Sequence, residues 1–389
     1  MKKLLSVLLI ALLVGIALTY SLSGQIAFGE ASAPGPDKPH TQADGTKWRL
    51  AYCESESFSN YTATLVGIAR GLAEMGWITN LDSFENIIAT NSSQEIWHYL
   101  ASKEVSPYLE FVDNAFYNLK SAEGIDEEII GRLSQQQDID LILVMGTRGG
   151  LALANNRHST NTLVFGASNA VRSGIIQSEE DSGLDHVWAH TDLQRFERQI
   201  KVMYDIVNFK KLGMVYENSE VAKVYSAVSE VEKLAREKGF EIVRYYVNEP
   251  IKAEEYKQYY EQVGEAYRKL AGDVDAMYVT IASLDPGMLP ELLEPFYEQK
   301  IPVFSQLGEI EVEHGALLTV AVMDEINLGR FGANTIGMSL SGLKPRDIEQ
   351  SFQSSPRLIL NLEVLRMMDF KIPYKLIMVV DKVYREVVR

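Results

Sequence analysis

The stretch LVMGTRGGLALAN, residues 143–155, combines the residue types of a turn that could hold an anionic ligand. An apolar run ends at Gly146, a short T-R-G-G turn follows, and helix-forming residues resume after it. Glycines let a ligand approach the backbone, and the N–H groups at a helix start attract carboxylates and phosphates. We therefore expect the three glycines to admit an anion here, with Thr147 and Arg148 donating side-chain hydrogen bonds.

The same stretch does not fit a nucleotide-binding loop. A phosphate loop needs Gly-Lys followed by Ser or Thr, and the sequence has no such triplet. A dinucleotide loop needs G-x-G-x-x-G after the first strand, whereas this chain has G-x-x-G-G after its third apolar run. Two interpretations remain: a wall of a solute-binding site, and a plain strand-to-helix turn with Arg148 in solvent.

The residues that could bind a metal ion or act as a general acid and base have a spacing that does not favour either role. His186 and His190 have the spacing of a helical metal pair, but the alternating sequence DHVWAHTD favours an extended segment. Extended backbone would hold them about 13 Å apart, at roughly 3.3 Å per residue. Glu309, Glu311 and Glu313 alternate, which predicts one solvated face of an extended loop rather than a catalytic pair. We expect no metal site.

The candidate nucleophiles also lack the local sequence context that a catalytic cysteine or serine requires. Cys53 ends an apolar run, where a cysteine is more often a small core residue. Ser168 lacks the G-x-S-x-G elbow of serine hydrolases. We therefore expect neither an enzyme nor a cofactor.

The composition of the chain excludes some classes of binding partner. The chain has 389 residues, 53 acidic against 37 basic side chains, and a formal charge of −16. Such a charge repels nucleic acid and anionic lipid. The single cysteine excludes an intramolecular disulfide, and a chain this long is expected to form two lobes.

The N-terminus has the layout of a secretory signal peptide. Two lysines precede an apolar stretch from Leu4 to about Leu18, and Ala31-Ser32-Ala33 offers a cleavage site. We expect residues 1–33 to be removed and the protein to be periplasmic; a retained membrane anchor is the alternative. Residues 34–46, rich in Pro, Gly and polar side chains, are expected to form a disordered lead-in.

Short apolar runs alternate with amphipathic helical stretches in two series, which predicts an α/β protein with two doubly wound parallel-sheet lobes. The expected strands are 48–53, 108–112, 141–145 and 162–165 in the first series, and 212–216, 241–247, 276–280 and 303–305 in the second. The expected helices are 61–75, 126–136, 221–238, 254–270 and 288–299. We assign 47–192 plus 319–347 to lobe 1, with a helical insertion at 79–106, and 193–318 plus 348–389 to lobe 2. Three hinge crossovers are expected near 190–194, 316–321 and 345–352.

From Trp48 to about Pro373 the chain resembles the solute-binding proteins of ABC importers with a type I periplasmic-binding fold, in the group that includes aromatic amino-acid binders. The resemblance is carried by IPVFSQLGEIEVEHGALLTVAVMDEINLGR (301–330), LSGLKPRDI (340–348) and RLILNLEVLRMMDFKIP (357–373). It departs at Asn169-Ala170, where the family often has Asp-Pro, at the helical insertion, and at Leu365–Asp369, where it often has A-x-x-L-G.

The resemblance implies a monomer that captures a small solute, most simply an amino acid, and delivers it to a membrane permease and its ATPase. The same fold also serves as the sensing module of a membrane-associated receptor, and a periplasmic enzyme is a further alternative.

The candidate ligand-binding residues follow the carboxyl ends of the expected strands, where ligands bind in open parallel sheets. Thr147, Ser168 and Asn169 could donate to a carboxylate. Glu217, Asp285 or Asp324 could receive an ammonium group, and for Asp324 the resemblance implies this position. The full set is Ser57, Phe58, Thr147, Arg148, Ser168, Asn169, Tyr216, Glu217, Asn218, Ser283, Asp285, Gln306 and Asp324.

Overall fold

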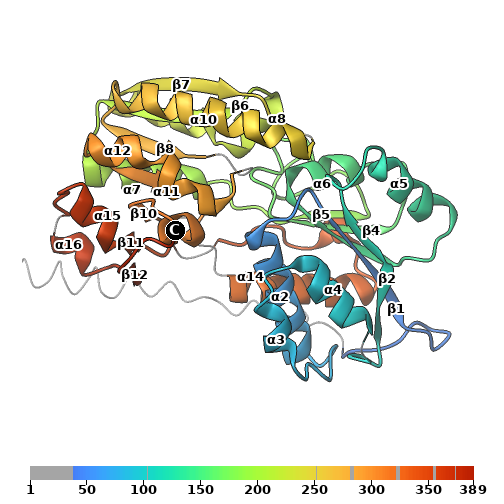
Figure 1. Cartoon of the computed structure of the whole chain (residues 1–389). Helices are drawn as coiled ribbons and strands as arrows, with labels where there is room; N and C mark the ends of the chain where they lie inside the picture. The colour runs from blue at the N-terminus through green and yellow to red at the C-terminus, as the bar shows by residue number, and fades with distance from the viewer. Residues whose placement is uncertain are drawn as a thin grey trace, which may run out of the picture. The chain divides into compact units, whose positions relative to one another are not determined.

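The structure, a computed structural model, describes residues 38–102, 104–250, 252–280, 284–320, 325–353, 356–372 and 374–389. The expected signal peptide, residues 1–33, lies outside them. The described strands form two sheets, one of five strands and one of seven (Figure 1). We call each sheet with its covering helices a lobe, lobe 1 for the five-stranded sheet and lobe 2 for the seven-stranded sheet.

Lobe 1 contains a wholly parallel sheet in the order β2-β1-β3-β4-β5. Its strands are β1 (Trp48–Glu54), β2 (Leu109–Asn118), β3 (Leu141–Met145), β4 (Asn161–Phe165) and β5 (Val187–Ala189). Its helices are α2 (Ser59–Glu74), α3 (Phe84–Ile88), α4 (Ser93–Ser102), α5 (Ile125–Gln135), α6 (Gly146–Leu153) and α14 (Glu325–Leu340). The helical insertion expected at 79–106 thus holds α3 and α4.

Alternation along β1 divides the core of lobe 1 into two layers. Leu50 and Tyr52 face one side, where α2, α4 and α14 contribute their apolar residues. Ala51 and Cys53 face the other, with residues of α5 and α6. Successive side chains of a strand point to opposite faces, so a strand covered on both sides is apolar throughout.

Lobe 2 contains a sheet in the order β12-β11-β10-β9-β8-β6-β7, parallel except for the β10–β11 pair. Its strands are β6 (Lys211–Glu217), β7 (Glu241–Val247), β8 (Ala276–Val279), β9 (Val303–Ser305), β10 (Leu318–Thr319), β11 (Ile359–Asn361) and β12 (Lys382–Tyr384). Its helices are α7 (Arg195–Val207), α8 (Glu220–Tyr225), α9 (Val228–Lys238), α10 (Tyr256–Ala271), α11 (Leu289–Leu292), α12 (Glu294–Glu298), α13 (Glu309–Glu313), α15 (Leu362–Met367) and α16 (Tyr374–Ile377).

The chain passes between the lobes three times. It enters lobe 2 after β5, returns after β10 to place α14 against α2, and leaves again to add β11 and β12 to the seven-stranded sheet. At the crossing Thr191 pairs with Ser351 in an isolated parallel bridge. The predicted fold of two doubly wound lobes is confirmed, and the second crossing begins after Thr319, which still belongs to the sheet of lobe 2.

Several local predictions differ from the structure. The helix expected at 288–299 divides into α11 and α12, and the strand expected at 108–112 continues to Asn118. The helix expected at 221–238 breaks into α8 and α9 at Ala227, whose φ of 53° lies in the left-handed region. The acidic run expected to be an extended loop is the helix α13, and Glu311 is only 4% exposed. An alternation of three glutamates fits the solvated face of a strand, but burial of Glu311 beside Ser305 decides the local structure.

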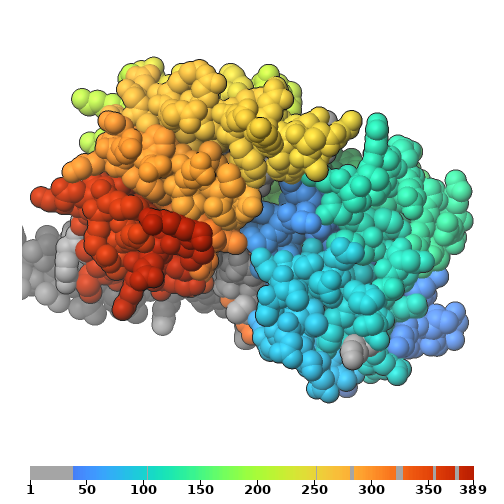
Figure 2. Space-filling view, in the orientation of Figure 1, coloured from blue at the N-terminus to red at the C-terminus, as the bar shows by residue number. Residues whose placement is uncertain are grey.

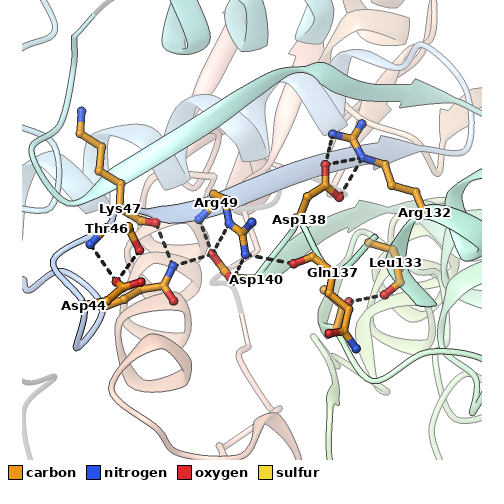
Figure 3. Close-up of polar contacts among 11 residues, drawn as sticks. Asp44, Thr46, Lys47, Arg49, Arg132, Leu133, Gln137, Asp138 and Asp140 are labelled. Carbon is orange, nitrogen blue, oxygen red and sulfur yellow. Dashed lines mark hydrogen bonds and ion pairs between the residues drawn. The ribbon is translucent and has the colours of Figure 1, made fainter. Parts of the chain in front are cut away.

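Residues 38–46, expected to be a disordered lead-in, pack against lobe 1 instead. Trp48 donates its indole N–H to the carbonyl oxygen of His40 at 3.0 Å. Gln42 donates to a carboxylate oxygen of Asp140 at 3.1 Å, and Arg49 reaches the same carboxylate through its backbone N–H and its guanidinium (Figure 3). The polar composition of the segment does not predict these contacts, because the contact with Asp140 joins residues that are far apart in the sequence.

Asp140 is therefore expected to hold the start of β1 in place. Asp140→Ala removes the acceptor of the Arg49 backbone N–H, 2.7 Å away, and should lower the free energy of unfolding by about 2 kcal/mol. Urea unfolding measures this change. Asp113→Ala is the matched control, because the Asp113–His98 ion pair is exposed on both sides and its loss should cost under about 0.5 kcal/mol. Equal losses in the two variants would contradict the role given to Asp140.

Candidate functional site

A cavity that is partly open to solvent lies at the carboxyl ends of β1, β3, β4, β7 and β9. Both lobes contribute to its wall, and Figure 2 shows lobe 1, blue to teal, in contact with lobe 2, yellow to orange. The lining residues of lobe 1 are Ser55, Glu56, Phe58, Asn60, Tyr61, Thr147, Arg148, Gly166 and Ser168. Those of lobe 2 are Arg195, Phe196, Tyr225, Glu249, Gln306 and Leu307. We call this space the interlobe cavity.

Aromatic rings form one part of the wall. Phe58 and Tyr61 meet edge to face with ring centroids 5.1 Å apart, and Phe196 and Tyr225 face the same cavity from lobe 2. Burial raises the pKa of the Tyr61 hydroxyl above its ordinary value. These rings offer an apolar surface on which a flat or aliphatic group could stack.

The glycines of the 146–150 turn serve packing rather than ligand approach. A Cβ atom at Gly146, whose φ is 88°, would lie 2.2 Å from the Tyr61 hydroxyl. A Cβ atom at Gly149 would lie 2.8 Å from Val144, and one at Gly150 would lie 2.6 Å from Ile175. The expectation that all three glycines admit a ligand was therefore wrong, because protein atoms already occupy the space beside each of them.

The polar side chains of this turn do face the cavity. Thr147 lines it and accepts a hydrogen bond from the Ser168 N–H at 3.2 Å, so the turns after β3 and β4 are joined. Arg148 also lines it, and its guanidinium contacts the carboxylate of Glu249 in lobe 2. The turn thus forms part of the cavity wall, with a protein carboxylate beside its arginine.

Four charged residues connect the lobes at this wall. Glu249 also lies 3.4 Å from Lys120, and Lys120 lies 2.6 Å from Glu56. We call Arg148, Glu249, Lys120 and Glu56 the interlobe ion-pair chain. Burial, the largest single influence, lowers the pKa of Arg148, but the charge of Glu249, its hydrogen bond and other nearby groups together outweigh burial and the pKa is raised. Burial likewise lowers the pKa of Lys120, but the charge and hydrogen bond of Glu56, together with the charge of Glu249, raise it overall.

The structure distributes the other predicted residues over three places. Phe58, Thr147, Arg148, Ser168 and Gln306 line the interlobe cavity, whereas Ser57 and Asp285 line a second, adjacent cavity together with Phe58. Four residues line neither: Asn169, Tyr216, Glu217 and Asn218. Ser283 and Asp324 lie outside the described residues.

Glu217 is hydrogen-bonded to two tyrosine side chains of lobe 2. It is 1% exposed and accepts hydrogen bonds from the hydroxyls of Tyr225 and Tyr259, each at 2.9 Å. Burial raises the pKa of its carboxyl group, and the two hydroxyls offset part of that rise. An ammonium group in the interlobe cavity would not reach it without displacing Tyr225, which lines that cavity.

Sequence reasoning missed several charged or aromatic residues of the wall, among them Arg195, Phe196, Tyr225 and Glu249. Arg195 and Phe196 begin α7 just after the first interlobe crossing, and Glu249 follows β7 by two residues. Arg195 was overlooked because it follows an interlobe crossing rather than a strand end. Burial lowers the pKa of Arg195, and the charge of Asp192 offsets only part of this effect.

The second cavity is acidic, and one of its carboxyl groups should make stability depend on pH. Burial raises the pKa of Glu311 to about 7, from the ordinary glutamate value of about 4.3. Folding therefore takes up a proton between these values, so the free energy of unfolding falls as pH rises through about 5 to 7. Glu311→Gln should reduce this fall, with a smaller part remaining from Glu217, whose pKa burial also raises, and should be more stable than the wild type at pH 8, by on the order of 2 kcal/mol.

Urea unfolding at pH 5 and pH 8 measures this difference. Glu313→Gln, on the same helix but more exposed, should keep the pH dependence of the wild type. A Glu311→Gln variant that retains the full fall with pH would show that another group is responsible.

The histidines considered for a metal site are held by the backbone. His186 and His190 each contact a carbonyl oxygen, of Asn155 at 3.0 Å and of Phe352 at 2.9 Å. In the part of the chain that the structure describes, no three His, Cys, Asp or Glu side chains are grouped to hold a metal ion. Among the same residues, no helix combines the length and apolar character needed to cross a membrane.

Comparison with known structures supports the fold. A domain from Streptococcus pneumoniae in complex with L-tryptophan is 17% identical, with a TM-score of 0.66. A conserved domain protein from Vibrio cholerae is 18% identical with a TM-score of 0.62. A ligand-free, open substrate-binding protein with adhesive properties from Clostridium difficile is 18% identical with a TM-score of 0.60. Each match covers 87% of this chain and 100% of the other.

Sequence comparison identifies the family. A comparison with curated proteins finds no match. Residues 107–384, however, match the family described as ABC transporter substrate binding protein, and this span is more than half of the chain. The match includes all three segments that carry the resemblance, 301–330, 340–348 and 357–373. The chain therefore belongs to the ABC transporter substrate-binding proteins, with a type I periplasmic-binding fold.

Proposed function

We propose that this chain is the solute-capturing component of an ABC importer and that its interlobe cavity takes a small carboxylate-bearing solute, an amino acid. The observation that carries this is the cavity itself, whose wall comes from both lobes at the carboxyl ends of their strands. Its wall offers guanidinium groups for a carboxylate, carboxylates for an ammonium group, and aromatic rings for an apolar side chain. An amino acid uses all three.

The wall favours a large apolar side chain on the solute. Phe58, Tyr61, Phe196 and Tyr225 line the cavity, two from each lobe. The structural relative from Streptococcus pneumoniae, which carries L-tryptophan, agrees with this choice. Asp324, at the family's acidic position after the lobe crossing, remains our candidate for the ammonium group, and Ser283 a candidate polar contact.

Capture follows from the two-lobed arrangement. A solute bound to one lobe adds contacts for the other, so the free energy of binding favours the form in which both lobes surround it. That form would then be recognised by a membrane permease, with an ATPase driving transport. On this proposal the protein is exported to the periplasm, loses residues 1–33 and acts as a monomer.

Native mass spectrometry of the purified protein tests the proposal by identifying any solute that accompanies it. Calorimetry with L-tryptophan and L-leucine, each against its carboxamide, then tests the need for a carboxylate. We expect an amino acid to bind at least ten times more tightly than its carboxamide. A protein that binds only neutral or only cationic solutes would refute the carboxylate class. Permease and ATPase genes beside the gene for this chain would favour an importer over a receptor module.

A further inference from the structure

We infer that Gln306 makes the interlobe cavity selective for a solute with a hydrogen-bond donor, an N–H or O–H group, which the side-chain oxygen of Gln306 accepts. The inference rests on the proposed function and deepens it. It gives one candidate of the sequence analysis a definite role on the lobe 2 side of the cavity, and it excludes that residue as the site of the solute carboxylate, which cannot donate.

The backbone of Gln306 is fixed at the carboxyl end of the lobe 2 sheet. The residue directly follows β9, and its N–H donates to the carbonyl oxygen of Val279, the last residue of β8, at 2.9 Å. The N–H groups of Leu307 and Gly308 donate to the hydroxyl of Ser305 at 3.0 and 3.1 Å. The side chain therefore starts from a well-braced turn, which limits the freedom that is lost when a solute binds.

A backbone carbonyl group sets the orientation of the Gln306 amide. The side-chain nitrogen, Nε2, donates to the carbonyl oxygen of Tyr225 at 2.6 Å. A carbonyl oxygen only accepts, so the NH2 group must face Tyr225 and the amide oxygen, Oε1, must lie on the other side of the amide. Turning the amide over would bring two acceptors into contact. The orientation of Oε1 is thus determined by chemistry.

This oxygen has no partner within the protein. Gln306 is only 3% exposed, and among the residues that the structure describes nothing donates a hydrogen bond to Oε1. The atom is also closed off from bulk solvent. A buried acceptor without a donor is disfavoured, because it has given up its hydrogen bonds to water and gained none in return. A donor on the solute would remove this penalty.

The wall around Gln306 places the side chain where a solute is enclosed. Gln306 lines the interlobe cavity together with Tyr225 of lobe 2 and Asn60 of lobe 1. Asn60 donates its side-chain N–H to the carbonyl oxygen of Leu307, the residue after Gln306, at 3.2 Å. This contact joins lobe 1 to the turn that carries Gln306, so closing the lobes encloses the side chain with whatever occupies the cavity.

Selectivity follows from the unpaired oxygen. Closure around a solute with a donor satisfies Oε1, whereas closure around a solute without one leaves it buried and unpaired. Sites that hold an unpaired buried group in this way reject analogues that lack the matching group. In an amino acid the donor is either the α-ammonium group or an N–H or O–H group of the side chain. The two share one hydrogen-bonding chemistry, and analogues that lack one or the other distinguish them.

Calorimetry with L-tryptophan and two analogues tests the inference. Indole-3-propionate lacks the ammonium group, and L-3-benzothienylalanine has sulfur in place of the indole N–H. Gln306→Met keeps the length of the side chain without the amide. In this variant the loss of affinity caused by one of the two analogues should shrink by about tenfold relative to the wild type, and the loss caused by the other should not change. The analogue whose effect shrinks identifies the donor.

L-Leucine provides a second probe. Its ammonium group is its only donor, so 4-methylpentanoate is the single analogue needed if leucine is the bound amino acid. Gln306→Glu keeps an acceptor but loses the N–H that Tyr225 accepts, so it should keep the preference of the wild type for the solute with the donor. This variant separates the role of Oε1 from the contact with Tyr225.

Gln199→Met is the matched control. Gln199 is a second buried glutamine of lobe 2, 4% exposed, and it lines neither the interlobe cavity nor the second cavity. Its variant should show the same ratios of affinity between L-tryptophan and each analogue as the wild type. Circular dichroism and thermal unfolding verify that the variants fold; if Gln306→Met does not, Gln306→Ala replaces it, since alanine also lacks the acceptor.

The outcomes separate the inference from the function it rests on. Ratios that are unchanged for both analogues in Gln306→Met would overturn the role of Gln306 and leave the proposed function standing. Loss of the preference in Gln306→Glu as well as in Gln306→Met would do the same, because it would assign the effect to the contact with Tyr225. Failure of every amino-acid probe to bind the wild type would overturn the proposed solute class, and the inference with it.

Discussion

Gly329→Ala is expected to lower the free energy of unfolding by about 3 kcal/mol or more. A Cβ atom at Gly329 of α14 would lie 2.1 Å from the carbonyl carbon of Gly67 in α2 and 2.3 Å from its Cα atom. Both are backbone atoms, so no side-chain rotation relieves the overlap and the two helices must separate. This separation would open the lobe 1 core that α2 and α14 share. Urea unfolding followed by circular dichroism measures the loss.

Gly131→Ala is the matched control. Gly131 lies inside helix α5, and a Cβ atom there would have no atom within 4 Å. Alanine has the higher helix propensity, so this variant should be unchanged or more stable by up to about 1 kcal/mol. If Gly329→Ala were as stable as Gly131→Ala, the close approach of α2 and α14 would not exist in solution.

Gly146→Ala is expected to damage both stability and solute binding. Alanine at a φ of 88° costs about 1–2 kcal/mol, and its methyl group would meet the Tyr61 hydroxyl at 2.2 Å. Tyr61 must then move, and because it lines the interlobe cavity we expect a loss in affinity of about tenfold or more for the bound amino acid. Urea unfolding and calorimetry with L-tryptophan and L-leucine measure the two effects.

Gly174→Ala isolates the backbone part of this effect. Gly174 also has a positive φ, 78°, but a Cβ atom there would have no atom within 4 Å. This variant should lose about 1 kcal/mol of stability and keep its affinity for the amino acid. If Gly146→Ala behaves in the same way, the contact between Tyr61 and the turn has no part in shaping the cavity.

The strands were the most predictable part of the fold. Leu141–Met145, Glu241–Val247 and Val303–Ser305 have the bounds expected from the sequence. The first and last are buried throughout, so their apolar runs end where the strand ends. Cys53, expected in the core, is buried there. In such strands the physical signal lies within a few neighbouring residues.

The cavity wall was harder to predict because its signals are not local. Glu249 forms ion pairs with Arg148 and Lys120, which are distant from it in sequence. Arg195 follows an interlobe crossing, where no strand end marks a ligand position. Glu311 looks like one member of a solvated acidic run, yet a hydroxyl of the neighbouring strand and the surrounding core bury it. The sequence therefore predicted which loops meet at the cavity better than which of their side chains face it.

The pairing of α2 with α14 also has a consequence for the order in which the chain can fold. α2 follows the first strand of lobe 1, whereas α14 comes only after ten strands of both lobes, and the sheet of lobe 2 still awaits β11 and β12. Contacts between segments so far apart close large loops and slow folding. On a ribosome, the apolar face of α2 would stay uncovered until synthesis is nearly complete. Neither lobe can then complete its fold before the other. Throughout elongation the nascent chain exposes apolar surface that chaperones can bind.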